Sequence, residues 1–372
     1  MARIGIDCRM YSSKFTGIGR YVYELVHHLA ALDTKNTYVL FFNEPEFSAF
    51  IPPNERFTKI LAAARHYSLA EQTVFLWKLM RAKLDLMHFT HFNAPILYPR
   101  KSIVTIHDLT LSFFPGNKMR SPFYRAAYRL TLSRSVHHAK KIITVSNYTA
   151  KDLEKMFDIS PEKIHTIYEG VNENFIRNEN VEELQTSKKK FKIEKPYILY
   201  TGVWRSHKNL VNLIRAFKQL KDKYKEEVQL IITGRKDPLY PEVERTAKES
   251  GYENDIIFTG MISENDLINL YSGAHAYCLP SLYEGFGLSP LEAMKCGIPT
   301  VVSRVSCLPE VCGDAALYFD PCDSADICEK LHTATVNDEI RTRLITEGHA
   351  RVQQFSWKKM TEETLEIYNR VS

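Results

Sequence analysis

The segment that decides the fold is AHAYCLPSLYEGFGLSPLEAMKCGIPTVV, residues 274–302. It begins with an apolar run that ends at Leu279, continues through a loop with two glycines, and finishes in a β-branched run over 299–302. Pro290 suits the first turn of a helix and Gly297 suits its end. The segment therefore predicts a strand, a loop, a short helix and a second, parallel strand, which together form a β-α-β unit.

The same alternation of apolar runs and amphipathic stretches continues along almost the whole chain. The first series of expected strands is 3–7, 37–42, 85–89, 102–107, 141–145 and 163–168. The second series is 197–201, 228–233, 255–258, 274–279 and 299–302. Two comparable series predict an α/β protein with two similar domains, each a parallel sheet covered by helices on both faces.

Domain limits follow from composition. The stretch 172–195 is polar and charged, which suits a linker, so we expect one domain over 1–175 and another over 176–355. The tail 356–372 reads as a helix that Ser356 caps, with Trp357, Met360, Ile367 and Val371 along one face. We expect this helix to pack back on the first domain.

Overall composition excludes several classes of protein. The chain has 372 residues, 44% hydrophobic and 25% charged, which excludes collagen, a coiled-coil rod and general disorder. The net charge of +5 favours nucleotides, phosphates or acidic lipids and is too small to indicate nucleic acid. Seven cysteines without a C-x-x-C pair predict reduced thiols and a cytoplasmic location. We see no apolar signal core at the start of the chain and no stretch of about 18 apolar residues that would span a membrane.

The loop at 284–288 is a candidate phosphate or sugar site. Glycines let backbone amides approach an anionic ligand, and the N-terminus of a helix adds positive potential. The two nearby carboxylates, Glu284 and Glu292, could also indicate a glycosidase, but eight residues of helix span about 12 Å against about 5 Å between the carboxyls of a retaining glycosidase. From these residues alone, a structural role for both carboxylates stays equally open.

The sequence EGFGLSPLE, with Glu284 and Glu292 in an E-x7-E pattern, and AMKCGIPTVVS after it resemble the donor site of retaining glycosyltransferases of family 4. Further stretches that agree in order are TGIGRY at 16–21, the loop after Tyr200, GMIS at 260–263 and LPE at 308–310. The resemblance covers nearly the whole chain. It implies a GT-B fold, in which two Rossmann-like domains face a central cleft, with 1–175 on the acceptor side and 176–355 binding the nucleotide sugar.

The resemblance also implies roles for residues of the second domain. Glu292 would hold the ribose and Glu284 would contact the donor sugar. The backbone amides that bind sugar hydroxyls or phosphate would be those of Gly285, Phe286, Gly287 and Leu288. Met261 would lie beside the base, and no metal or cofactor is required, in agreement with the absence of a D-x-D motif.

Two cations follow the strand 197–201. An arginine fork and a lysine point charge both suit a diphosphate, and the family places such a pair on the donor pyrophosphate. Lys208 matches the family directly, whereas Arg205 matches less well because Val203 stands where the family's arginine often lies. Both side chains would stabilise charge on the departing diphosphate. The alternative is a solvated basic loop before the helix 210–220.

In the first domain, Gly17 and Gly19 are expected to form a loop before a helix at 20–32. By resemblance, Gly17 lies near the donor phosphate and the acceptor, while a plain turn is the alternative. His107 ends the strand 102–107, where open α/β sheets bind ligands, and the family has a histidine there near the sugar. A core histidine with satisfied hydrogen bonds is the alternative reading of His107.

The stretch 109–151 contains eight cations and no acidic residue. The cations are Lys118, Arg120, Arg125, Arg129, Arg134, Lys140, Lys141 and Lys151. With Phe113, Phe123 and Tyr124 among them, the stretch is a candidate for docking on an anionic membrane surface or binding a lipid-linked acceptor. A solvated helix face is the alternative.

The resemblance therefore predicts a cytoplasmic enzyme, peripheral at the inner face of the membrane, that moves a hexose from a nucleotide-diphosphate sugar to a hydroxyl of a glycan or lipid-linked acceptor. GDP-mannose is preferred and UDP-glucose is next, because the N-terminal motif and the IHDL segment at 106–109 look like those of mannosyltransferases. Alternatives are an epimerase or phosphorylase of GT-B fold and a catalytically silent sugar-nucleotide-binding protein.

Overall fold

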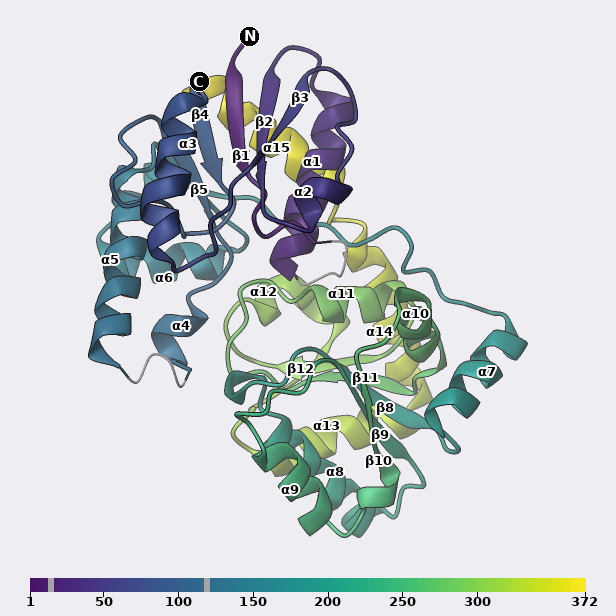
Figure 1. Cartoon of the computed structure of the whole chain (residues 1–372). Coiled ribbons are helices and arrows are strands. Elements are labelled where there is room, and N and C mark those ends of the chain that lie inside the picture. Colours follow the sequence, from purple (N-terminus) through teal and green to yellow (C-terminus); the bar gives the residue numbers. More distant parts are fainter. Residues whose placement is uncertain (13–16, 117–120) are drawn as a thin grey trace. The chain divides into compact units, whose positions relative to one another are not determined.

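A computed structural model describes residues 1–12, 17–116 and 121–372. The chain divides into two compact units (Figure 1). Unit 1 is Met1–Gly170 together with Ser356–Ser372, and unit 2 is Val171–Phe355. Each unit contains one parallel sheet with helices packed on it, so the predicted α/β class with two Rossmann-like domains is confirmed.

The sheet of unit 1 has seven parallel strands in the order β3-β2-β1-β4-β5-β6-β7. The strands are β1 (Arg3–Asp7), β2 (Thr37–Phe42), β3 (Phe57–Leu61), β4 (Leu86–Phe89), β5 (Ser102–Ile106), β6 (Lys141–Thr144) and β7 (Ile164–Thr166). The helices are α1 (Gly17–Leu32), α2 (Glu46–Ala49), α3 (Leu76–Arg81), α4 (Thr110–Phe113), α5 (Pro122–His138), α6 (Asn147–Phe157) and α15 (Trp357–Val371). The central strands are wholly buried, as expected of parallel strands covered on both faces.

The C-terminal helix α15 belongs to unit 1, where it packs against α1. Ser356 caps it by accepting a hydrogen bond from the backbone N–H of Lys359. The hydroxyls of Thr361 and Thr364 donate to carbonyls one turn earlier, so these polar side chains can lie among the buried residues of the helix. The Tyr368 hydroxyl lies 2.6 Å from Nδ1 of His88 on β4.

The sheet of unit 2 has six parallel strands in the order β10-β9-β8-β11-β12-β13. The strands are β8 (Tyr197–Thr201), β9 (Gln229–Thr233), β10 (Ile256–Gly260), β11 (Ala276–Leu279), β12 (Thr300–Ser303) and β13 (Leu317–Phe319). The helices are α7 (Val181–Phe191), α8 (Leu210–Tyr224), α9 (Glu242–Glu249), α10 (Glu264–Gly273), α11 (Leu288–Lys295), α12 (Leu308–Cys312), α13 (Ser324–Val336) and α14 (Asp338–Val352). The central pair of this order, β8 and β11, carries the two loops in which most donor-site residues were predicted.

The boundary between the units lies after Gly170, five residues before the predicted position. Val171 and Phe175 are buried in unit 2, where the Phe175 ring packs edge-on against Tyr271. In the same unit, the Lys295 ammonium donates to the carbonyl of Asn172. These contacts assign the segment to the second unit.

The segment predicted as a linker, 172–195, contains the helix α7. The Asn180 side chain caps it by accepting hydrogen bonds from the amides of Glu182 and Glu183, and the three lysines at 188–190 occupy its last turn. Acidic residues at the start and basic residues at the end complement the helix dipole. The polar composition therefore marks an exposed helix as well as a connection, and Ser187 is the one buried residue of α7.

Two strands of the described chain, β3 and β13, were not predicted. Both lie at a sheet edge, and their residues are mostly only half-buried. A strand of this kind lacks the continuous apolar run that marks a central parallel strand. The search for apolar runs overlooked these two edge strands but found the other two, β7 and β10, although their residues are also mostly half-buried.

The expected loop before α1 is wrong. The helix begins at Gly17, three residues before the predicted start, so Gly17 and Gly19 lie in its first turn. Because glycine is permissive in both states, a pair of glycines does not by itself mark a loop. Thr16 of the same motif, like Lys118 and Arg120 of the basic stretch, lies outside the described residues.

Candidate active site

The loop after β8 is fixed to the loop after β11. Trp204 is buried, a 3-10 turn covers Ser206–Lys208, and Asn209 takes the left-handed conformation before α8. The Asn209 amide donates to the carbonyls of Pro280 and Pro321 at 3.0 and 2.8 Å. Because β8 and β11 are neighbours in the sheet, these bonds hold the basic loop, residues 202–209, beside the loop that contains EGFG, residues 284–287, called the EGFG loop below.

Lys208 and Glu284 meet at the end of these two loops. The Lys208 ammonium lies 2.6 Å from Oε1 of Glu284, and the Ser281 hydroxyl donates to the same oxygen, also at 2.6 Å. The two charged side chains are 20% and 12% exposed, so a ligand can reach them although they are partly shielded from water. Two residues predicted to act on the donor thus form one charged pair.

The EGFG loop leads into α11 through Gly287. This glycine has φ +93°, and a Cβ there would lie 2.9 Å from Cδ2 of Leu308. Both the left-handed backbone and the lack of space favour glycine at this position. The Phe286 side chain is buried and packs edge-on against Phe355, so it is the backbone of this residue, and not its ring, that remains a candidate for donor binding.

Ser306 and Cys307 hold the same loop from behind, and the sequence analysis did not identify them. The Ser306 hydroxyl accepts the backbone N–H of Glu284 at 3.0 Å. The Cys307 thiol lies 3.2 Å from the carbonyls of both Glu284 and Phe286. Burial, and next the Glu284 charge, raise the pKa of Cys307 well above its usual range, so the thiol keeps its proton for these bonds. The only signal in the sequence was their position before LPE at 308–310.

Glu292 is bound to the end of β8 through a tyrosine. The Tyr271 hydroxyl donates to Oε2 of Glu292 at 3.1 Å, and the Thr201 hydroxyl lies 2.9 Å from the same tyrosine oxygen. Burial, followed by the Glu292 charge, raises the pKa of Tyr271 well above its usual range, so Tyr271 stays a donor. This contact engages one oxygen of Glu292 and helps to hold the carboxylate in place.

The turns after β8, β9 and β10 come together at the carboxyl edge of the sheet. Gly234 has φ +119°, and a Cβ there would lie 2.0 Å from the carbonyl oxygen of Gly202. The N–H of Gly234 also donates to the carbonyl of Gly260 at 3.0 Å. Met261 follows directly and is 65% exposed. The same edge carries Arg235 after β9, a third cation besides Arg205 and Lys208 that was not predicted as a site residue.

Arg205 precedes the 3-10 turn that carries Lys208, and its side chain is exposed. The carbonyl of Arg205 accepts the N–H of Lys208 at 2.9 Å. Within the described ranges, the guanidinium has neither a hydrogen bond nor an ion pair. A cation held at the edge of the loop and not paired internally suits an anionic ligand.

His107 lies in unit 1, directly after β5. Its Nδ1 is 3.0 Å from Oε1 of Glu169 and its Nε2 is 3.0 Å from the carbonyl oxygen of Thr90. The Tyr21 ring packs edge-on at 4.8 Å between centroids. Both ring nitrogens are therefore occupied, which corresponds to the alternative of a satisfied, buried histidine. Gly17 lies in the first turn of α1 in the same unit.

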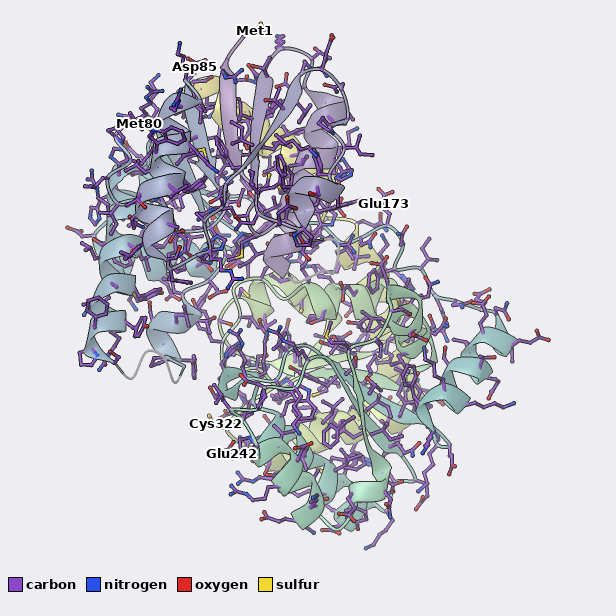
Figure 2. The ribbon with its side chains drawn as sticks, in the orientation of Figure 1. Met1, Met80, Asp85, Glu173, Glu242 and Cys322 are labelled. Carbon is purple, nitrogen blue, oxygen red and sulfur yellow. The ribbon has the colours of Figure 1, made fainter. Side chains whose placement is uncertain are left out.

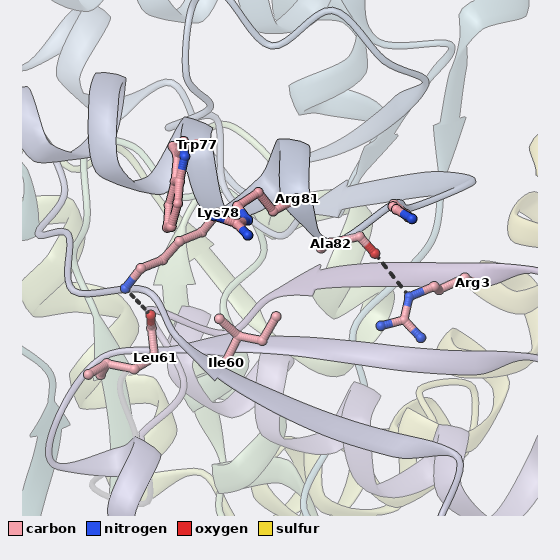
Figure 3. Close-up of a pocket in the computed structure, with 8 residues that line it drawn as sticks. Arg3, Ile60, Leu61, Trp77, Lys78, Arg81 and Ala82 are labelled. Carbon is pink, nitrogen blue, oxygen red and sulfur yellow. Dashed lines mark hydrogen bonds between the residues drawn. The ribbon is translucent and has the colours of Figure 1, made fainter.

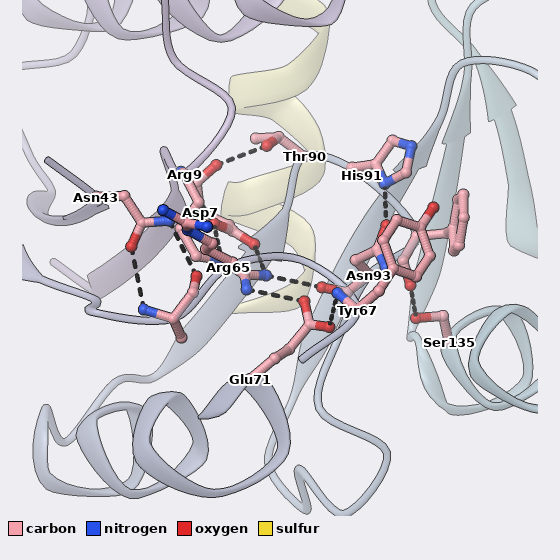
Figure 4. A network of polar contacts seen from close by, with 12 residues as sticks. Asp7, Arg9, Asn43, Arg65, Tyr67, Glu71, Thr90, His91, Asn93 and Ser135 are labelled. Carbon is pink, nitrogen blue, oxygen red and sulfur yellow. Dashed lines mark hydrogen bonds and ion pairs between the residues drawn. The ribbon is translucent and has the colours of Figure 1, made fainter. Parts of the chain in front are cut away.

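A buried charged network occupies the ends of β1 and β4 in unit 1 (Figure 4). The Arg9 guanidinium binds both oxygens of Asp7 at 2.9 and 2.7 Å, Oε1 of Glu71 at 2.8 Å and the carbonyl of Asn93 at 2.9 Å. Burial would raise the pKa of Asp7, but the Arg9 charge and hydrogen bonds lower it below its usual value. No sequence motif predicted this network, because its residues are up to 84 positions apart in the chain.

A surface pocket of about 650 Å³ lies elsewhere in unit 1 (Figure 3). It is lined by Arg3, Ile60, Leu61, Trp77, Lys78, Arg81, Ala82 and Lys83. The Arg81 guanidinium lies over the Trp77 ring at 4.7 Å, and the Lys78 ammonium donates to the carbonyl of Leu61. This pocket contains none of the predicted site residues.

Three general expectations concern metals, membranes and thiols. Among the residues that the structure describes, no group of three or more His, Cys, Asp or Glu could hold a metal ion. In the same ranges, no helix is both long enough and apolar enough to cross a membrane. The seven cysteines, all within the described ranges, are free, and Cys322 alone is exposed. Figure 2 labels Cys322 among the side chains of unit 2.

Comparison with known proteins identifies the family. A model described as "Glycosyl transferases group 1" matches residues 181–351, and one described as "Glycosyltransferase Family 4" matches residues 15–175. The O-antigen chain mannosyltransferase B of Escherichia coli is 31% identical over 373 residues, covering 95% of this chain and 96% of that protein. The serotype-specific mannosyltransferase WbdA of Escherichia coli is 29% identical over 276 residues, covering 73% of this chain and 34% of that protein.

The fold has close counterparts among solved structures. Sucrose-phosphate synthase from Thermosynechococcus elongatus superposes with a TM-score of 0.79 at 19% identity, covering 100% of this chain and 99% of that chain. This likeness concerns the fold alone. With a matching family model on each unit and a relative 31% identical over nearly its whole length, the chain belongs to glycosyltransferase family 4 and is a glycosyltransferase of GT-B fold.

Proposed function

We propose that this glycosyltransferase moves mannose from GDP-mannose to a hydroxyl of a polysaccharide or lipid-linked glycan, with retention at the anomeric carbon. Support for mannose comes from the names of the relatives, two of which are mannosyltransferases and one of which acts on O-antigen chains by name. The IHDL segment at 106–109 and the N-terminal motif favour GDP-mannose over UDP-glucose, because both resemble those of mannosyltransferases.

The observation that carries the donor-site proposal is the 2.6 Å contact between Lys208 and Glu284. When the bond between C1 of the sugar and the diphosphate oxygen breaks, negative charge develops on the leaving diphosphate, and the cations of Lys208 and Arg205 stabilise it. Glu284 accepts hydrogen bonds from sugar hydroxyls, and Glu292 does so from the ribose.

The acceptor oxygen attacks C1 on the face that the diphosphate leaves, and the leaving phosphate takes the acceptor proton. The new bond joins C1 to the acceptor oxygen, and the products are the glycoside and GDP. This route needs no enzyme nucleophile, metal or cofactor. The backbone groups of Gly285, Phe286, Gly287 and Leu288 bind the donor, Met261 lies beside the base, and Gly17 approaches the donor phosphate.

The experiment uses the full chain with GDP-mannose labelled with ¹³C at C1, and a mannose oligosaccharide with a lipid-like tail as acceptor. We expect an α-linked product by NMR and weaker or absent transfer from UDP-glucose. An inverted product contradicts the proposed stereochemistry. A changed sugar nucleotide formed without acceptor indicates an epimerase, release of a sugar phosphate indicates a phosphorylase, and binding without turnover indicates a silent binding protein.

We further propose that the enzyme is cytoplasmic and binds an anionic membrane surface through α5 and its neighbours. Phe123 and Tyr124 are 76% and 53% exposed, and Arg125 and Arg129 are exposed on the same helix. Tyr128 is buried, so one face of α5 packs on unit 1 and the opposite face is exposed and available to a membrane surface. Exposed aromatic rings among cations suit the headgroup region of a bilayer.

A further inference from the structure

Unit 1 contains a buried imidazole–carboxylate pair outside the predicted donor loops. The side chains of His107 and Glu169 are 7% and 5% exposed, and Nδ1 lies 3.0 Å from Oε1. The other ring nitrogen, Nε2, lies 3.0 Å from the backbone oxygen of Thr90. Glu169 belongs to none of the motifs that the sequence analysis quoted.

The hydrogen-bond partners of His107 limit which of its ring nitrogens can carry protons. A backbone carbonyl can only accept a hydrogen bond, so Nε2 must carry a proton. An ionised carboxylate can also only accept, so Nδ1 must carry one as well. A neutral imidazole has one N–H and cannot satisfy both. The geometry therefore requires either an imidazolium beside a carboxylate, or a neutral imidazole beside a protonated acid.

The neighbours of His107 add no competing positive charge. Burial, and next the His107 charge, lower the pKa of His88 to about 3, and burial first of all lowers that of His91 to about 3, so both rings are neutral near pH 7. Burial also keeps the Tyr21 hydroxyl protonated by raising its pKa. Asp108 follows in sequence and accepts the N–H of Thr110.

The backbone that carries Glu169 is held in place by close packing. A Cβ on the next residue, Gly170, would lie 2.1 Å from the backbone nitrogen of Trp357. This approach fixes the backbone directly after Glu169 within unit 1. An imidazole N–H to an ionised carboxylate is also among the stronger hydrogen bonds.

We propose that Glu169 is a positioning residue that keeps His107 doubly protonated, so that His107 supplies a fixed positive charge at the carboxyl edge of unit 1 and does not act as a base. The proposal rests on the proposed function only in placing that charge near the reacting sugar. The protonation of the ring can be tested without any substrate.

The primary test is ¹⁵N NMR of the full chain labelled at histidine, with the His107 signals assigned from His107→Asn. At pH 7.5 we expect both ring nitrogens of His107 to carry protons. In Glu169→Gln, the side-chain amide can donate to Nδ1, so the ring should lose one proton. A singly protonated ring in the unmodified protein, or an unchanged ring in Glu169→Gln, overturns the proposal.

The matched control is Glu226→Gln. Glu226 lies 2.5 Å from Nδ1 of His332 in unit 2, in the connection between α8 and β9 at the opposite edge of the sheet from the donor loops. This variant should leave the His107 signals unchanged, and a change there would show that the readout is not local.

Kinetics test the consequence. With GDP-mannose, Glu169→Gln should lower kcat by at least about tenfold with little change in KM, because the charge is lost but binding groups stay. Glu169→Asp, which keeps the charge, should recover part of the rate, and it also serves if the glutamine variant does not fold. An unchanged kcat with a deprotonated ring overturns the role of the charge. An enzyme that never transfers mannose, but shows the expected ring protonation, contradicts the proposed function and not this pair.

Discussion

The Lys208 ammonium and the Glu284 carboxylate lie 2.6 Å apart although 76 positions separate them in sequence. The neighbouring strands β8 and β11 bring their loops together. In the proposed function, Lys208 stabilises the leaving diphosphate and Glu284 contacts the sugar, so the contact would orient the cation. Removing either partner should affect both functions.

Lys208→Ala should lower kcat about 10²- to 10³-fold, because one preorganised positive group is lost where charge develops. The double variant with Glu284→Gln should lose less than the product of the two single effects, since the pair acts as a unit. Steady-state transfer from GDP-mannose measures both. Lys218→Ala, which removes an exposed ion pair with Asp222 on α8, is the control and should retain full activity. A Lys208→Ala enzyme with unaltered kcat would refute the donor-site assignment.

Tyr271→Phe should raise the KM for GDP-mannose about five- to tenfold with little change in kcat, because the lost hydrogen bond frees the Glu292 carboxylate to move away from the ribose. Tyr197→Phe is the control, since its hydroxyl donates to the carbonyl of Leu270 in the same unit. It should lower stability without raising KM. Equal KM values for the two variants would show that Tyr271 does not orient Glu292.

Cys307→Val should lower kcat and donor affinity, because it removes the thiol that binds the carbonyls of Glu284 and Phe286. The free energy of unfolding should also fall, by about 1 kcal/mol. Cys307→Ser keeps a donor and should recover much of the activity. Cys328→Val, on α13, tests for a general effect of replacing a largely buried thiol. If the serine and valine variants are equally active, the hydrogen bonds do not matter.

Unit 1 should lose stability in mild acid. Burial first of all lowers the folded-state pKa of both His88 and His91 to about 3, below the value of about 6.5 in the unfolded chain. A lowered histidine pKa means that the unfolded state binds more protons, so the stability present above pH 6.5 is lost as pH falls toward 3. At pH 5 the loss is about 2 kcal/mol per histidine.

Hydrogen exchange of peptides from β4 and α15 at pH 7.5 and pH 5 measures this loss in unit 1 itself. His88→Gln should show about half of it, because one of the two groups no longer titrates. The same pH dependence in the variant and the unmodified protein would mean that His88 contributes nothing.

Reversing charge with Arg125→Glu and Arg129→Glu should reduce binding to vesicles that contain anionic lipid, because each cation near the surface contributes about 1 kcal/mol. Cosedimentation with vesicles that contain about 30% phosphatidylglycerol measures the fraction of protein bound. Arg245→Glu, exposed on α9 of unit 2, is the matched control and should bind as before. Unchanged binding of the double variant to anionic vesicles would exclude α5 as the membrane surface.

The strands of the two sheets could largely be predicted from the sequence, since a parallel strand buried on both faces leaves an apolar run. The ends of α11 could also be predicted from nearby residues, namely Pro290 in its first turn and Gly297, with φ +69°, after its last turn. The edge strands β3 and β13 were missed, since their mostly half-buried residues give a weaker apolar run, whereas the other edge strands, β7 and β10, were found. The start of α1 was misplaced because glycine allows helix and loop alike.

The sequence by itself determined the fold class, the loops that end at strand termini and the residue types suited to a sugar nucleotide, because these depend on neighbours along the chain. Tertiary structure decided which of those side chains meet. It paired Lys208 with Glu284, placed Cys307 behind the EGFG loop and brought Glu169 to His107. Strand order and close packing make these contacts across tens to more than seventy positions, where no local pattern records them.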